Sequence, residues 1–189
     1  EIYTLSLHDA LPIYEFQERI LRLQVGADCK VVVEPERRDT APAIMLACEH
    51  LHSVQGIDND DVVIVLPIDS YVDDSYFDRI VDVAAAVKNN VADICLLGAE
   101  PTYPSEKYGY IVPSSSTGSP RLVERFIEKP DSSTAADLIS KGALWNNCVF
   151  GFKLGYVLNI INNYGSYLDF ADLRARYSEL PINSFDYEV

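Results

Sequence analysis

Two short apolar runs, VVIVLP at 62–67 and ADICLLGA at 92–99, constrain the fold more than any other feature of this sequence. Continuous apolar runs of this length are typical of strands that are buried on both faces. Between them, residues 74–89 repeat apolar side chains at helical spacing, behind Asp74 or Ser75 as the helix N-cap. A strand, a helix and a second strand in this order predict a βαβ unit and therefore a largely parallel sheet.

Turn-forming segments in the second half of the chain predict an antiparallel arm and further helices. SSSTGSP (114–120) lies between two strand-like runs, so we expect a β-hairpin there. In the segment that follows, Ser132 or Ser133 is expected to cap a helix that Gly142 ends. These patterns predict one α/β domain. The remaining predicted strands are 30–34 and 144–152, and the remaining predicted helices are 15–24, 43–55 and 153–164.

The acidic composition argues against several classes of partner. A net charge of −14 disfavours a general nucleic-acid or anionic-membrane surface, because both require clustered Lys and Arg. It permits a small anionic ligand, which a few basic residues and backbone N–H groups can bind. No apolar run reaches the roughly 20 residues of a membrane span. The four scattered cysteines form no CxxC pair and are expected to be reduced thiols, so we expect a cytoplasmic protein.

Three polar loops follow predicted strands, at the edge where open parallel sheets bind ligands. Their sequences are EPERRDTAP, IDSYVDD and AEPTYPSEKYGYI. Asp69, at the end of a buried strand, is placed either to hold Mg²⁺ against a phosphate or to cap a turn. Arg37 and Arg38 precede a helix, where they can hold a phosphate or a base edge, or one of them is a surface residue.

Two further features are ambiguous when each is considered alone. Gly109 in YGYI either lets a ligand approach the backbone or marks a bulge in a strand. Glu128 in EKP can accept two sugar hydroxyl hydrogen bonds and Lys129 can bind a phosphate, but these residues also suit an exposed strand end. The order and spacing of all these signals are more specific than any one of them.

In this order, the motifs resemble the sugar-1-phosphate nucleotidylyltransferases, and most closely the mannose-1-phosphate guanylyltransferases. The resemblance implies a Rossmann-like (GT-A-like) nucleotidyltransferase fold of the α/β class, with a mostly parallel sheet, flanking helices and a β-hairpin arm. It extends from about Glu15 to Val189. The segments that show it are EPERRDTAPAI (34–44), VLPIDSYV (65–72), PTYPSEKYGYIVP (101–113), RFIEKP (125–130), ALWNNCVF (143–150) and SFDYEV (184–189).

The resemblance also implies roles for individual residues. Asp69 corresponds to the Mg²⁺ carboxylate, and Asp69 and Lys129 to the catalytic groups at the phosphates. Gly109, Glu128 and Asn146 correspond to the sugar-binding residues. The implied reaction is attack of mannose 1-phosphate on the α-phosphorus of GTP, which gives GDP-mannose and pyrophosphate. The nucleotide-binding loop corresponds to Glu34, Pro35, Arg38, Thr40, Ala41 and Pro42.

The sequence departs from the family pattern in several places. Ser70 stands where the commoner form has His, and Cys148 stands where the family has the Gly of Trp-Asn-Ser-Gly. A G-G-x-G-x-R phosphate loop and a W-x-D-x-G-x-W segment, which bears a second metal-binding Asp, occur nowhere in the sequence. We therefore expect 14–189 to be a partial nucleotidyltransferase domain, truncated at both ends, lacking its first strand or strands and with little or no transferase activity of its own.

Residues 1–13 fit neither a signal peptide nor a clean helix or strand. No Lys or Arg precedes Arg19, and His8 and Asp9 interrupt the apolar residues. One reverse translation of EIYTLSLHDALPI reads as a common sequencing-library adapter in one frame. We therefore interpret 1–13 as an assembly artefact and leave it out of the expected fold.

The sequence allows other functions besides the leading one. One is nucleotidylyl transfer to another hexose 1-phosphate, and another is a non-catalytic paralogue that binds a nucleotide sugar and regulates a partner. A third is an α/β binding module with no enzymatic history, which six ordered motifs disfavour. For the leading function, the expected partners are GTP, mannose 1-phosphate and Mg²⁺, with a possible homo-oligomer of the intact protein.

Overall fold

The computed structural model describes residues 2–6, 23, 30–67, 71–115 and 117–189, and its internal packing divides the chain into two compact units. The first unit comprises Glu1–Cys95 and Phe150–Val189, and the second comprises Leu96–Val149. The sequence patterns predict one domain, whereas the hairpin arm and the helix after it form a small core of their own. The helix predicted at 15–24 lies outside the described residues, apart from Leu23.

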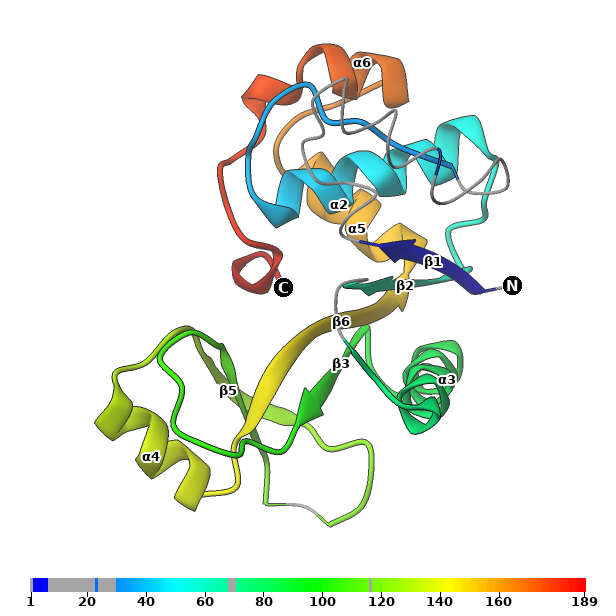
Figure 1. Cartoon of the computed structure of the whole chain (residues 1–189). Coiled ribbons are helices and arrows are strands. Elements are labelled where there is room, and N and C mark those ends of the chain that lie inside the picture. The colour runs from blue at the N-terminus through cyan, green and yellow to red at the C-terminus, as the bar shows by residue number, and fades with distance from the viewer. Residues whose placement is uncertain (1, 7–22, 24–29, 68–70, 116) are drawn as a thin grey trace. The chain divides into compact units, whose positions relative to one another are not determined.

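The first unit contains two ladders of strands and most of the helices. β1 (Ile2–Ser6) pairs in parallel with β2 (Val62–Leu66), and β2 pairs antiparallel with the end of β6 (Leu144–Lys153). Helix α2 packs against α5 and α6 (Figure 1). The helical segments are α2 (Thr40–Glu49), its π-helical continuation η1 (His50–Val54), α3 (Asp74–Lys88), α5 (Leu154–Asn162), α6 (Phe170–Ala175) and the 3-10 turns η2 (Tyr177–Glu179) and η3 (Phe185–Tyr187).

The apolar run at 62–67 behaves as predicted, and the helix after it begins slightly earlier than predicted. The first four residues of β2 are buried, as expected for a strand covered on both faces. The N-cap of α3 is Asp73 rather than Asp74 or Ser75, because Asp73 has extended backbone angles and its carboxylate accepts a hydrogen bond from the Ser75 N–H at 2.9 Å. A capping residue must lie outside the helix, and Asp74 is already helical.

Residues 30–34, which are predicted to be a strand, pair with no described part of the chain. Val32 and Glu34 are buried and their neighbours are more exposed, so burial alternates as in a strand although no ladder is present. Ile2–Ser6 instead pairs with β2, with Ile2 opposite Val62 and Ser6 opposite Leu66. The sequence analysis interprets residues 1–13 as an artefact outside the fold, whereas Ile2–Ser6 is a strand of the sheet in the structure. An open strand edge presents unpaired N–H and C=O groups, and an extended segment satisfies them.

The second unit contains the predicted β-hairpin. β4 (Tyr110–Pro113) and β5 (Val123–Ile127) are antiparallel, and β4 also pairs antiparallel with the start of β6. β3 (Ile94–Ala99) lies beside β6, and all of its residues are half-buried, so the prediction that this apolar run is buried on both faces was wrong. Helix α4 (Ser132–Ser140) buries its apolar face on β4. Asp131 caps α4 in place of Ser132 or Ser133, and Gly142 ends it at φ +81°, as predicted. The core of this unit consists of Tyr110, Val112, Ala135, Leu138 and Ala143.

The strand directions differ from the prediction although the fold class is confirmed. Among the described ladders whose direction is known, only the one between β1 and β2 is parallel, because β6 runs opposite to both β2 and β4. Helices lie beside the strands in both units, as an α/β protein requires. In the described ranges, no helix is both long and apolar enough to cross a membrane.

Candidate functional site

The loop after 30–34 is anchored to the C-terminal segment of the first unit by Arg38. Its Nε and Nη2 donate to the Leu180 carbonyl oxygen at 2.9 and 2.6 Å, and its Nη1 lies 2.6 Å from Oε1 of Glu36. All three nitrogens of this guanidinium therefore bind protein groups. The structure gives Arg38 an anchoring role, and its contact with a nucleotide stays a prediction.

The N-terminus of α2, where the sequence places a binding loop, is closed by protein groups. Asp39, at φ +70°, accepts a hydrogen bond from the Thr40 N–H at 2.7 Å. The Ala41 N–H donates to the Asn183 carbonyl at 3.1 Å, and Pro42 has no N–H. The first three helical residues therefore have no spare N–H for a phosphate. Pro35, earlier in the loop, is exposed.

Thr40 joins two motifs that are 145 residues apart in sequence. The Phe185 N–H donates to Thr40 Oγ1 at 2.9 Å. The Phe185 ring is buried against Phe150 and Phe152, with ring centroids 5.2 and 5.7 Å apart. The loop at 34–44 and the segment SFDYEV are thus parts of one packed structure.

Glu34 is a buried carboxyl group with one partner. Its Oε2 accepts a hydrogen bond from the Tyr177 hydroxyl, and its Oε1 is buried without a partner in the described part of the chain. Burial raises the pKa of Glu34 from 4.5 to about 7, although the Tyr177 hydrogen bond and the charge of Arg37 oppose the rise. Near neutral pH this carboxyl group is therefore partly protonated.

The buried Glu34 makes stability depend on pH in a defined direction. Since its pKa is higher in the folded chain, its contribution is complete below pH 4.5 and is lost as the pH rises through about 7. We expect the free energy of unfolding of the wild type to fall by about 1–3 kcal/mol over this window, relative to Glu34→Gln. Denaturant melts at several pH values measure this difference. The exposed Glu124→Gln is the control, and a parallel pH profile for wild type and Glu34→Gln would contradict the expectation.

The anchoring role of Arg38 gives a second expectation. In Arg38→Lys a single ammonium replaces the two donors that reach the Leu180 carbonyl, so we expect a loss of about 1–2 kcal/mol in the free energy of unfolding. Arg37→Lys, at an exposed neighbouring position, should change it by less than about 0.5 kcal/mol. Urea denaturation of both variants tests this. Equal changes in the free energy of unfolding would contradict the anchoring role of Arg38.

Three residues that the sequence predicts to bind sugar come together in the second unit. Gly109 lies just before β4, and its carbonyl oxygen accepts a hydrogen bond from the Asn146 N–H at 2.8 Å. A Cβ on Gly109 would lie 2.7 Å from Oε2 of Glu128 and 2.5 Å from Cζ of Phe126. The missing side chain of Gly109 therefore makes room for the Phe126 ring and the Glu128 carboxylate.

The neighbours of this cluster are also ordered by specific contacts. Lys129 Nζ lies 2.8 Å from Oε1 of Glu128, and Lys129 has a φ of +43°. The Cys148 N–H donates to Oδ1 of Asn146 at 3.1 Å, which orients the Asn146 amide. Cys148 has a φ of +55°, so it keeps the left-handed backbone that favours the family's glycine at this position.

An aromatic group beside the cluster was missed by the sequence interpretation. The Trp145 ring contacts the rings of Tyr103 and Tyr108, with centroids 5.1 and 5.0 Å away. The Trp145 Nε1 is buried with no hydrogen-bond partner in the described ranges. Tyr103 and Tyr108 in PTYPSEKYGYI, together with the tryptophan before Asn146, were the available signal. Nothing in their spacing indicated that the rings would meet.

The structure leaves the predicted metal ligand untested. Asp69 falls at 68–70, outside the described residues. Within the described residues, no three His, Cys, Asp or Glu side chains are grouped to hold a metal ion. A magnesium site therefore stays a prediction.

Comparison with known proteins shows the family to which this fold and these motifs belong. Residues 12–170 match the family model described as nucleotidyl transferase. The chain belongs to the nucleotidyl transferase family.

Similar proteins are named for alginate biosynthesis, for xanthan biosynthesis or as a mannose-1-phosphate guanylyltransferase. The chain is 30% identical to the alginate biosynthesis protein AlgA of Pseudomonas putida over 92% of its own length and 39% of that protein. It is 30% identical to mannose-1-phosphate guanylyltransferase RfbM of Salmonella typhimurium, over 84% of this chain and 37% of that protein. It is 35% identical to the xanthan biosynthesis protein XanB of Xanthomonas campestris, over 71% of this chain and 28% of that protein. The chain thus spans less than two fifths of these relatives.

Solved structures share the fold. A Thermus thermophilus protein described as mannose-1-phosphate geranyltransferase superposes with a TM-score of 0.78 at 27% identity, over 98% of this chain and 55% of that one. A protein of Helicobacter pylori described as mannose-6-phosphate isomerase superposes with a TM-score of 0.67 at 19% identity, which shows the fold alone.

Proposed function

We propose that this chain is part of an enzyme that transfers GMP from GTP to mannose 1-phosphate, giving GDP-mannose and pyrophosphate. A phosphate oxygen of mannose 1-phosphate forms a bond to the α-phosphorus of GTP, and the bond from that phosphorus to pyrophosphate breaks. The names of two relatives, both described as mannose-1-phosphate guanylyltransferases, one of them as putative, support this reaction class. The observation that supports it most is the meeting of Gly109, Glu128 and Asn146 in the second unit.

The geometry of that cluster suits a sugar. The Glu128 carboxylate and the Phe126 ring occupy the space that a side chain at position 109 would fill, so Gly109 allows the carboxylate its position beside β4. A carboxylate accepts hydrogen bonds from two hydroxyl groups, and the oriented Asn146 amide offers donors and an acceptor. Lys129, beside Glu128, brings a positive charge for the sugar phosphate.

The phosphates of the nucleotide need further positive charge. We assign Asp69 to Mg²⁺, since a carboxylate oxygen is the type of ligand that Mg²⁺ prefers. When bound, the ion would neutralise charge on the phosphate oxygens. We assign the loop from Glu34 to Pro42 to the nucleotide, with Arg38 acting indirectly by holding the loop on Leu180.

A second candidate is the same transfer to another hexose 1-phosphate. Cys148 and Asn147 stand where the family pattern has Gly and Ser, and the Cys148 N–H orients Asn146 directly. Side-chain atoms at these positions can alter which hydroxyl orientation the cluster accepts. Comparing GDP-mannose with GDP-glucose separates the two candidates.

Equilibrium binding of the nucleotide-sugar product tests the proposal on this chain. We expect isothermal titration to show tighter binding of GDP-mannose than of GDP-glucose or UDP-glucose. Glu128→Gln should weaken GDP-mannose binding by about tenfold or more, because a charged acceptor of two hydroxyl groups becomes neutral. Glu124→Gln, an exposed position on β5, is the matched control and should bind as the wild type does.

Three outcomes would count against the proposal. If Glu128→Gln and Glu124→Gln changed the affinity for GDP-mannose equally, the Glu128 cluster would not be part of the sugar-binding site. Preferential binding of GDP-glucose would favour the second candidate. Preferential binding of UDP-glucose would exclude guanine as the base.

A further inference from the structure

A cavity of about 530 Å³ lies wholly within the first unit, and none of its lining residues is among the predicted nucleotide or sugar residues. Its volume is in the usual range for small-molecule sites. Asn59 and Asp60 come just before β2, Asn90 and Asp93 come shortly before β3, and Gly155 comes just after β6. Since β6 is antiparallel to β2, its end lies at the start of β2. The cavity is thus at the amino-terminal edge of β2, opposite to the edge where such folds bind substrates.

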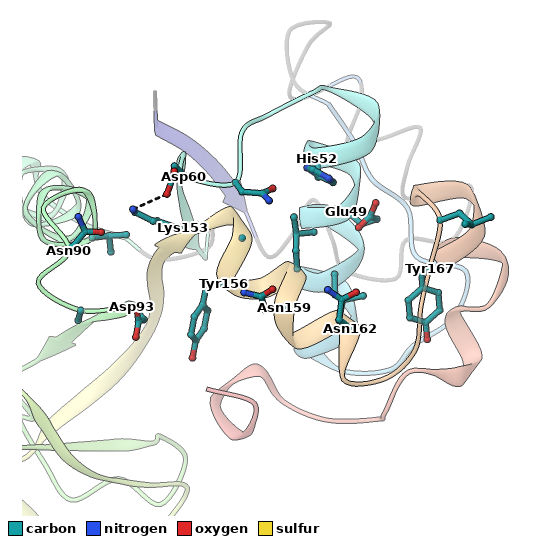
Figure 2. Close-up of a pocket in the computed structure, with 17 residues that line it drawn as sticks. Glu49, His52, Asp60, Asn90, Asp93, Lys153, Tyr156, Asn159, Asn162 and Tyr167 are labelled. Atoms are coloured by element: carbon teal, nitrogen blue, oxygen red, sulfur yellow. Dashed lines mark hydrogen bonds and ion pairs between the residues drawn. The ribbon is translucent and has the colours of Figure 1, made fainter.

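Helix α5 supplies one face of the cavity. Tyr156, Asn159 and Asn162 are spaced three residues apart, so they share one side of the helix. Figure 2 shows these three side chains on α5, with Glu49 at the end of α2, His52 on η1 and Tyr167 beyond them. Asn59 and Asn90 bring the number of lining amides to four. Each amide offers two donors and an acceptor, which matches a ligand with many hydroxyl groups.

The charges of the lining disfavour an anion. The one lysine, Lys153, is paired with Asp60, with 3.0 Å between Nζ and Oδ1 (Figure 2). Glu49 and Asp93 add two more carboxyl groups. A phosphate would meet more negative than positive charge here, whereas an uncharged ligand meets no such penalty.

Tyr167 is one of the two residues that follow α5 and line the cavity, together with Leu168. Its ring is fixed under the guanidinium of Arg176, whose Cζ is 4.5 Å from the ring centroid. Its hydroxyl oxygen is buried and has no hydrogen-bond partner in the described residues.

We propose that this cavity is a second binding site, for an uncharged carbohydrate. The site is separate from the proposed transferase function and from the Glu128 cluster. Its amides and carboxylates would bind the hydroxyl groups, and Tyr156 would contact the apolar face of the sugar ring.

Amide chemical shifts of the ¹⁵N-labelled chain, titrated with D-mannose as the probe, test this site. We expect shifts at 49–60, 90–93 and 153–168. Asn159→Leu should weaken D-mannose binding by about tenfold, because an exposed side chain that makes hydrogen bonds to the ligand is lost. Asn163→Leu, four residues further along and outside the lining, should leave it unchanged. Asn162→Leu repeats the test if the first variant loses its dispersed spectrum.

The same titration distinguishes this site from the transferase site. Glu128→Gln should leave the shifts at 153–168 in place, even though it weakens GDP-mannose binding. Inorganic phosphate and methylammonium are the charged comparison probes, and neither should bind as well as D-mannose. The proposal is overturned by shifts confined to 105–110 and 126–129, by no shifts, by equal binding to Asn159→Leu and wild type, or by stronger binding of either charged probe.

Discussion

Replacing Phe185 with Ala is expected to lower the free energy of unfolding by about 3–5 kcal/mol. The Phe185 ring is almost fully buried between Phe150 and Phe152, so its removal leaves a cavity that rigid strand residues cannot fill. Small domains are stable by only about 5–15 kcal/mol, which makes this a large fraction of the total. Guanidinium denaturation followed by circular dichroism measures it.

Tyr187→Ala is the matched control for Phe185→Ala. Tyr187 belongs to the same short motif and the same 3-10 turn, but its side chain is 63% exposed. Its truncation should cost less than about 1 kcal/mol. If Phe185→Ala lowered the free energy of unfolding no more than this control does, Phe185 would not be packed in the core of the first unit.

Gly151→Ala is expected to lower the free energy of unfolding by about 1–3 kcal/mol. An added Cβ would lie 2.5 Å from Cγ1 of Val83 and 2.9 Å from Cδ1 of Ile64. Both neighbours are buried, so neither can move aside into solvent. The absent side chain of Gly151 therefore allows α3 to pack closely on β6.

A double-mutant cycle tests this explanation. Val83→Ala removes the Cγ1 atom that the new Cβ would meet, so the loss in Gly151→Ala/Val83→Ala should be smaller than the sum of the two single losses by about 1 kcal/mol or more. Urea denaturation of the four proteins gives the coupling free energy. Simple additivity would show that the steric contact is not the cause.

The predictions from sequence were best where a local pattern decides the structure. The apolar run at 62–67 became β2, and the helical spacing after it became α3. The turn-rich segment at 114–120 became the connection of a hairpin. These elements follow from periodicity and turn chemistry, which depend on residues close together in the chain.

The prediction at 30–34 failed because a strand needs a partner as well as a suitable sequence. Val31–Val33 has strand propensity, yet no described segment pairs with it, and the edge of β2 pairs with Ile2–Ser6 instead. The direction of β6 was missed for the same reason, since neighbours in a sheet are chosen by long-range packing.

The sequence by itself determined the α/β class, the order of most elements and the motifs that indicate a nucleotidyltransferase. The tertiary structure alone decided what the motif residues contact. It paired Glu34 with Tyr177, committed Arg38 to Leu180, and placed the Glu128 carboxylate over Gly109. The physical reason is that propensity and periodicity act over a few residues. Burial, which shifts the pKa of Glu34, and hydrogen bonds, which occupy Arg38, depend on groups more than 140 positions away in the chain.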